Sequence, residues 1–524
     1  MNLAKALGSV GGLTLASRVL GLVRDALFAR FVGANFASDA FQIAFKLPNM
    51  FRALFAEGAF SAAFIPLFNR KVAAGDQAEE GRGLAAGIRF AEDALSILLP
   101  VLIIMTVVME LAAWPVTWAL TGGFRDATPE QFDYAVGLAR LTFPYLLLIS
   151  LVSLLGGILN SLHRFWITAA APILLNATLI AALLLFHQPD PLLTARNQAI
   201  AVTVSGLLQL AWLWWACRRA GVTLRIKRPQ LGPDVRNLLR LIGPAAAGAG
   251  AVQFNLVVST MLTAAFLPSG SVSYIYYADR LNQLPLGLIG IGLGTVLLPT
   301  ISRQLGRGEE GAAMATQNRG LELALFLTLP ATAALIACGL PIVAALFQGG
   351  RFGATEALLT SQALAAFSVG LPAYILVKVL TPGYYARSDT RTPVRYAMIA
   401  MAVNLGLNLI LILPLAHIGP PLATAIASTV NVVLLYRALR KRGHFTPDAQ
   451  LRRRTPRLVI SAILMGVAMW FGNALFAPYV TGSSLERWAA LAVLVGAGML
   501  VYAAATFLTG AVRVAELKRL IRRA

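Results

Sequence analysis

The stretch "SRVLGLVRDALFAR", residues 17–30, has the apolar character of a membrane helix and yet carries three arginines and one aspartate. Arg18 and Asp25 are seven residues apart, close to two helical turns, so they share one helix face, and Arg24 borders that face. A charge near the centre of a bilayer costs roughly 2.5–3.5 kcal/mol on insertion scales, so it persists where it faces water or a partner. These residues therefore predict a polar site inside a membrane protein.

The rest of the chain supports this membrane assignment. Its 524 residues are 58% hydrophobic and only 13% charged, and the mean hydropathy is +0.71. Apolar runs of about 20 residues, the length that crosses the hydrocarbon core, recur throughout. We predict an all-α polytopic membrane protein with about fourteen transmembrane helices. They are placed at roughly 6–32, 34–68, 84–113, 133–160, 168–187, 197–217, 237–265, 272–302, 319–346, 356–386, 394–415, 418–437, 457–478 and 487–510.

The basic excess of the chain follows the predicted topology. The net charge is +21, and most Lys and Arg residues fall in alternate loops and at the termini, which places both termini in the cytoplasm by the positive-inside rule. The predicted outer loops carry only Arg30, Arg125, Arg196, Arg351 and Arg487. The excess is thus a topology signal with a weak attraction to anionic membrane lipids, and no nucleic-acid partner is predicted.

No metal or cofactor site is predicted. Cys217 and Cys338 lie in different segments, and the four histidines show no ligand spacing. Asn404 and Asn408, one turn apart, could offer oxygens to a sodium ion, but no carboxylate stands beside them in sequence. Hydrogen bonding between helices is the favoured interpretation of this pair.

An internal repeat indicates how the helices are organised. Residues 39–71 resemble residues 271–304 at an offset near 234, and both would be the second helix of a six-helix set. We predict two parallel-repeat six-helix bundles around a central cavity, residues 1–220 and 221–445, followed by helices 13 and 14 with a basic cytoplasmic tail, residues 446–524. Transporters built from such repeats place the substrate site where the halves meet.

The charged and amide residues inside the predicted spans are the candidate substrate-binding residues: Arg18, Arg24, Asp25, Asp39, Lys46, Asn49, Arg52, Glu57, Asp279, Arg280 and Lys378. Six of them are basic and four acidic, so the predicted cavity carries two net positive charges. Arginine suits a phosphate because its planar fork bonds two oxygens. An anionic substrate is therefore predicted. The alternative interpretation is that these charges pair off and lock helices together.

Other residues receive structural interpretations. Glu92, Asp93 and Glu322 are predicted to be groups at the cytoplasmic rim. Pro48 is expected to kink its helix, and Pro382-Gly383 to break another.

Three stretches resemble the lipid II flippases called MurJ or MviN, within the superfamily of multidrug and polysaccharide exporters. They are 17–66, which begins "SRVLGLVRDALFARFVGANFASDAF", 269–299, and "KVLTPGYYARSDTRTPVR" at 378–395. The resemblance covers essentially the whole chain. It implies transport of undecaprenyl-pyrophosphate-linked peptidoglycan precursor, lipid II, to the periplasmic leaflet by alternating access.

The resemblance also implies which residues matter and where the protein acts. Arg18, Arg24, Asp25, Asp39 and Arg280 match the cavity charges of the family, and helices 13 and 14 match its groove for the lipid tail. It implies that the protein acts in the bacterial inner membrane. It also implies cell-wall synthesis proteins as further partners. Family members often carry two basic residues where this chain has Arg52-Ala53, which leaves a paired basic site in doubt.

Two transporter alternatives and one enzyme alternative compete with this prediction. A multidrug exporter would favour a negatively charged cavity, whereas an exporter of another polyprenyl-linked saccharide is not separated by charge. A membrane enzyme would need metal-binding acids or a base, and the acidic loop 121–134 has no ligand pattern. The prediction is therefore a flippase and not an enzyme.

Overall fold

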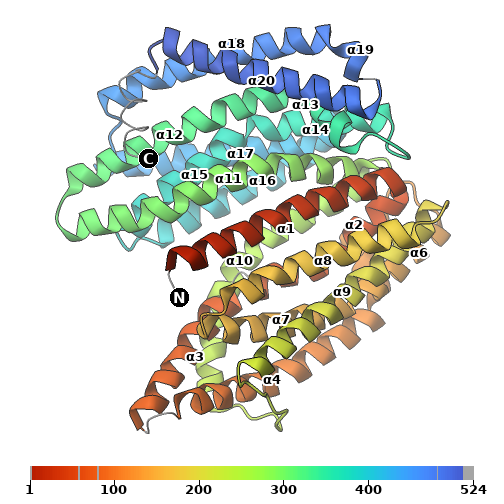
Figure 1. The fold of residues 1–524 in the computed structure, drawn as a ribbon, viewed down its shortest axis with the longest axis vertical. Helices are drawn as coiled ribbons and strands as arrows, with labels where there is room; N and C mark the ends of the chain where they lie inside the picture. Colours follow the sequence, from red (N-terminus) through yellow and green to blue (C-terminus); the bar gives the residue numbers. More distant parts are fainter. Residues whose placement is uncertain (1–2, 57–58, 79–81, 481, 512–524) are drawn as a thin grey trace. The chain divides into compact units, whose positions relative to one another are not determined.

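The computed structural model describes residues 3–56, 59–78, 82–480 and 482–511, and nearly all of them lie in helices. These residues form no strand beyond one isolated bridge between Gly349 and Phe352. The chain divides into two compact units, Met1–Ser273 and Tyr274–Ala524 (Figure 1). The predicted all-α membrane fold is confirmed.

The first unit is built around α7. Its helices are α1 (Leu3–Val32), α2 (Phe36–Ala56), α3 (Ala59–Ala78), α4 (Gly83–Leu111), α5 (Ala113–Thr121), α6 (Pro129–Thr142), α7 (Pro144–Ser161), α8 (Phe165–Phe186), α9 (Pro191–Arg219) and α10 (Pro233–Phe266). Helix α7 packs against α2, α3, α4 and α9, and most of its side chains are buried. Helix α1 lies along α8, as Figure 1 shows.

The second unit carries the remaining helices. They are α11 (Ser271–Gly306), of which the first three residues belong to the first unit, α12 (Glu310–Ala337), α13 (Gly339–Phe347), α14 (Ala354–Val369), α15 (Leu371–Tyr385), α16 (Arg391–Leu415), the 3-10 turn η1 (Ala416–Ile418), α17 (Gly419–Lys441), α18 (Ala449–Leu475), α19 (Ala477–Val480) and α20 (Ser484–Leu508). Helices α18 and α20 pack together and against α12, around the buried Met465, Met469 and Tyr502 (Figure 1).

Ten helical stretches of the described residues are long and apolar enough to cross a membrane. One of them, Arg391–Lys441, contains two of the predicted helices, and α1 and α2, which carry the first candidate charges, are not among the ten. Large apolar side chains such as Leu185 and Leu500 are about three-quarters exposed. Such an apolar exterior suits a lipid environment.

The two helices that contain Pro48 and Pro382 are both continuous. Helix α2 runs through Pro48, and α15 runs through Pro382 and Gly383 to Tyr385. The predicted break at Pro382-Gly383 was wrong, because Pro382 removes only its own backbone donor and helical bonding continues past it, with the N–H of Ala386 on the Pro382 carbonyl. Gly383 instead permits close packing on α12, where a Cβ would lie 2.6 Å from Nε2 of Gln317. The predicted span 356–386 is interrupted instead at Gly370, between α14 and α15.

Gly206 of α9 permits close helix packing in the first unit's core. A Cβ at this position would lie 2.8 Å from a ring carbon of Tyr145 and 3.0 Å from a methyl carbon of Leu148. Tyr145 is completely buried and Leu148 nearly so, so neither has room to withdraw.

Gly206→Ala should therefore lower the free energy of unfolding by about 1–3 kcal/mol through overpacking. Gly137→Ala is the matched control, since a Cβ added to Gly137 of α6 would meet no atom within 4 Å, and helical glycine-to-alanine changes gain about 0.5–1 kcal/mol. Thermal unfolding in detergent measures both variants. Equal melting temperatures would contradict this account of α7–α9 packing.

Candidate functional site

The candidate charges of α1 form a buried pair that also reaches α8. Nε and Nη2 of Arg24 donate to the same Asp25 oxygen at 3.0 and 2.6 Å, and both residues are under 10% exposed. Nη1 of Arg24 donates to Oδ1 of Asn176 at 3.2 Å, and the amide of Asn176 donates to the carbonyl of Ser17 at 3.0 Å. The arginine is thus held in one orientation by α1 and α8 together.

The carboxylate of Asp39, near the start of α2, binds the first turn of α11. One oxygen accepts the backbone N–H of Gly270 at 2.6 Å, and the other accepts the N–H of Ser273 at 2.8 Å and its hydroxyl at 2.6 Å. Ser38 adds a hydroxyl contact of 2.7 Å to Ser273. A carboxylate stabilises a helix N-terminus because unsatisfied N–H groups and the positive end of the helix dipole meet there. Asp39, buried to 2% exposure, therefore has a structural role in this structure.

The other candidates of the first unit differ from these residues in their exposure and in their partners. Arg18 is exposed, and Lys46 is half-buried with its amine on the hydroxyl of Thr260 in α10. Nε of Arg52 donates to Oδ1 of Asn49 at 3.0 Å, one turn away on α2. Glu57 lies outside the described residues.

In the second unit, two candidate charges lie on the first half of α11 and the third lies on α15. The guanidinium of Arg280 donates to the hydroxyl of Tyr276 at 3.1 and 3.0 Å and lies 5.1 Å from the centre of that ring. Asp279 accepts the side-chain amide of Gln283. Lys378 of α15 is exposed, and its side chain passes Gly290, where a Cβ would lie 2.9 Å from Nζ.

Several polar partners of these charges were not among the sequence-predicted residues. Asn176, Tyr276, Ser273 and Thr260 each hold a candidate charge. Two of them leave a signal in sequence: Asn176 is an amide within the apolar run 172–186, and Tyr276 lies four residues before Arg280, one helical turn. The Ser273 and Thr260 contacts depend on separate helices meeting, for which no local pattern exists.

The asparagine pair of α16 forms hydrogen bonds within the protein. Nδ2 of Asn408 donates to the carbonyl and to Oδ1 of Asn404 at 2.9 Å each, and Nδ2 of Asn404 donates to the Thr424 hydroxyl of α17 at 3.1 Å. The bond from Asn404 to Thr424 is the interhelical hydrogen bonding expected of membrane asparagines, whereas the bonds from Asn408 to Asn404 lie within α16. Among the described residues, no group of three His, Cys, Asp or Glu side chains could hold a metal ion.

Comparison with known proteins extends this description. The family "Lipid II flippase MurJ" matches residues 28–490. A probable lipid II flippase of Rhizobium tropici is 41% identical over the whole of this chain and 97% of its own length. A solved lipid II flippase in an inward closed conformation has a TM-score of 0.77 at 24% identity, covering 95% of this chain and 98% of its own. An inward-facing multidrug transporter of the MATE family has a TM-score of 0.64 at 15% identity, covering 82% and 97%. At these identities the two structures show likeness of fold alone.

The Asp39 contacts predict a graded loss of stability. Asp39→Ala removes every acceptor and leaves buried donors at the start of α11 unsatisfied, which should cost about 1–3 kcal/mol of unfolding free energy. Asp39→Asn keeps one acceptor oxygen and should lose less. Thermal unfolding in detergent tests this order, with the exposed Asp126→Ala as a control. A melting temperature for Asp39→Ala equal to that of the control would remove the capping role.

Proposed function

Because this chain belongs to the MurJ family of lipid II flippases, we propose that it moves lipid II, the undecaprenyl-pyrophosphate-linked disaccharide-peptide, from the cytoplasmic to the periplasmic leaflet. The match over residues 28–490 carries this proposal, and a relative 41% identical over the whole chain supports it. The family transports a lipid and is not an enzyme family. The peptidoglycan precursor is thus the substrate.

The chemistry of the substrate explains why membrane arginines serve this function. The headgroup combines a pyrophosphate with sugars and a peptide, and its transfer through hydrocarbon would leave charges and hydrogen-bonding groups unsatisfied. A polar, cationic route for the head avoids that cost, while the prenyl tail stays in lipid. Arginine can bind two phosphate oxygens with parallel hydrogen bonds, which makes Arg24 and Arg280 the leading candidates.

Local contacts orient both of these guanidinium groups. Asp25 and Asn176 orient Arg24, and Tyr276 orients Arg280 from one turn away. In our proposal, Arg24 and Arg280 each bind the pyrophosphate during transport, and alternating access exposes the head to each side of the membrane in turn. The remaining candidates, Arg18, Asp25, Asp39, Lys46, Asn49, Arg52, Glu57, Asp279 and Lys378, complete the proposed polar route or hold it in shape.

Membership in this family also supports a proposed cellular location and proposed partners. The protein is a multi-pass protein, and its family acts in the bacterial inner membrane. We place both termini in the cytoplasm on the distribution of Lys and Arg between loops. Membrane lipids and cell-wall synthesis proteins are proposed as its further partners.

Charge reversal at either proposed phosphate-binding residue tests this function. Arg24→Glu and Arg280→Glu should each abolish transport, because a carboxylate repels the pyrophosphate that the guanidinium would bind. The measurement is complementation of a strain depleted of its own flippase, with a leaflet assay for the precursor. Lipid II should accumulate on the cytoplasmic side.

The exposed Arg196→Glu is the matched control for charge reversal, and its transport should be normal. The amount of each variant in the membrane is compared by immunoblot, because a misfolded protein would also fail to transport. Normal precursor distribution with both Arg24→Glu and Arg280→Glu would refute the phosphate-binding role. Normal distribution in the depleted strain itself would refute the proposed substrate.

A further inference from the structure

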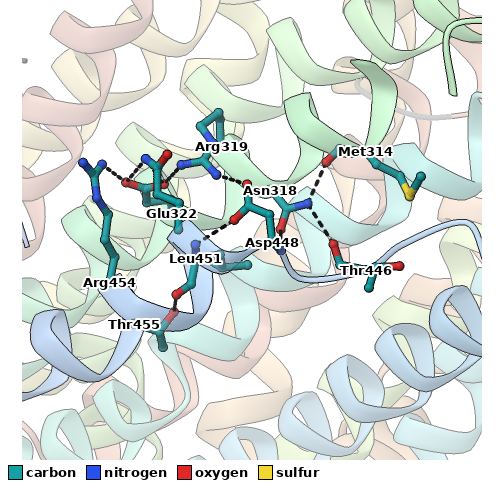
Figure 2. A network of polar contacts seen from close by, with 10 residues as sticks. Met314, Asn318, Arg319, Glu322, Thr446, Asp448, Leu451, Arg454 and Thr455 are labelled. Atoms are coloured by element: carbon teal, nitrogen blue, oxygen red, sulfur yellow. Dashed lines mark hydrogen bonds and ion pairs between the residues drawn. The ribbon is translucent and has the colours of Figure 1, made fainter. Parts of the chain in front are cut away.

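A cluster of charged residues joins the start of α18 to α12 in the second unit (Figure 2). Glu322 of α12 binds the guanidinium groups of Arg319 and Arg454, and Arg319 also binds the carboxylate of Asp448. The amide of Gln450 donates to Glu322 at 3.1 Å. Two acids and two arginines thus alternate across the two helices, and Glu322 at their centre is 9% exposed.

Amide contacts fix the segment that leads into α18. Nδ2 of Asn318 donates to the carbonyl of Thr446 at 3.0 Å, and its Oδ1 accepts the backbone N–H of Asp448 at 3.1 Å (Figure 2). Asp448 in turn caps α18, since its other oxygen accepts the N–H of Leu451 at 2.7 Å. The path from α17 to α18 is therefore fastened to α12 before α18 begins.

The first unit has a corresponding cluster on α4. One oxygen of Glu92 accepts the backbone N–H of Arg225 at 3.0 Å, and the amine of Lys227 lies 3.0 Å from the other and 2.9 Å from Asp93. Hydrogen bonding to Asp93 and Glu92 raises the pKa of Lys227, which keeps the amine charged. Glu92 is 6% exposed, so it too is a buried carboxylate with a basic partner.

The two clusters occupy equivalent places in the predicted repeat. Helices α4 and α12 are the third predicted helix of their six-helix sets, and residues 222–231 and 442–448 follow the sixth. Glu92 and Glu322 are related by nearly the offset that relates the two repeats. Their partners differ, a lysine and a backbone amide in one unit and two arginines in the other, so the arrangement recurs without the same residues.

A buried carboxylate is costly unless it is paired, and removing one partner leaves an uncompensated charge. Glu92 therefore favours the conformation in which residues 222–231 lie on α4. Glu322 favours the one in which the start of α18 lies on α12. In the second unit this contact also affects the rest of α18, because α18 continues along α12 from this point. Ala462, Met465 and Met469 of α18 join a buried cluster with Cys338, and Tyr502 of α20 donates to the carbonyl of Phe326 at 2.8 Å.

We propose that Glu92 and Glu322 are equivalent anchoring residues, each fastening the chain that follows the sixth helix to the third helix of its own unit. Glu92 does so through Arg225 and Lys227, and Glu322 through the start of α18, so that Glu322 sets the position of α18 on α12. The pair α18 and α20 then moves with α12 as one body. Glu322 is a positioning residue in this proposal and touches no substrate.

A disulfide between α12 and α18 reports the proposed position directly. A Cβ at Gly466 would lie 3.4 Å from Cβ of Ala333, close to the separation that a disulfide requires. In a chain with Cys217→Ala and Cys338→Ala, the double variant Ala333→Cys, Gly466→Cys should cross-link rapidly with a mild oxidant in membranes. Adding Glu322→Gln should slow the cross-linking several-fold, because the start of α18 is no longer held.

Two further variants separate positioning from general damage. Arg454→Gln removes a partner from the other side of the same contact and should also slow cross-linking. Glu92→Gln disrupts the anchor of the first unit and should leave the rate at 333 and 466 unchanged. Equal cross-linking rates with and without Glu322→Gln and Arg454→Gln would overturn the proposal, as would equal slowing by Glu92→Gln.

The transport assay tests whether α18 and α12 stay together during the cycle, and this arm alone rests on the proposed function. The oxidised and the reduced double-cysteine protein should transport lipid II equally. Loss of transport on oxidation, restored by a reductant, would show that α18 moves relative to α12 and would refute the one-body proposal. If neither form transports while the parent chain with native cysteines does, the cross-linking rates still decide the anchoring role. Failure of the parent chain would count against the proposed function only.

Discussion

A charged side chain in a membrane needs water or a partner, and this constraint accounts for the contacts that join helices at Arg24 and Asp39. Apolar helices pack against one another or face lipid without needing a polar partner. Each buried charge, by contrast, specifies where a second helix must lie. Arg24 relates α1 to α8 through Asn176, and Asp39 relates α2 to the first turn of α11. Apolar contacts place helices as well, as where Gly206 of α9 meets Tyr145 and Leu148 of α7.

The two interpretations of the intramembrane charges are compatible at the level of single residues. Asp25 pairs with Arg24 and so stabilises the helices, but the same contact orients a guanidinium that a phosphate could engage. Glu92 and Glu322, predicted as rim groups, are buried anchors with basic partners. Arg24, Asp25 and Asp39 are likewise satisfied within one unit, whereas Arg18 and Lys378 are exposed within theirs.

Sequence reasoning reached the candidate site through residue type and spacing. Arg18, Arg24 and Asp25 were identifiable because charges within an apolar run are rare and must face a polar group. Their partners were harder to predict, since hydrogen bonds such as Asp39 to Ser273 join residues far apart in the chain. The expected break at Pro382-Gly383 was wrong, and the close contact between Gly383 and Gln317 of α12 was likewise not predictable from local sequence.

The sequence by itself determined that the chain is a helical membrane protein of the flippase family. Hydropathy, helix length and the motif at residues 17–66 are local properties, and they carry that information without tertiary contacts. Only the tertiary structure decided which charges are paired, that Asp39 caps α11, and that Glu92 binds the segment after α9 while Glu322 binds the start of α18. Those outcomes depend on which helices meet, and helix packing is set by side-chain shape over many residues at once.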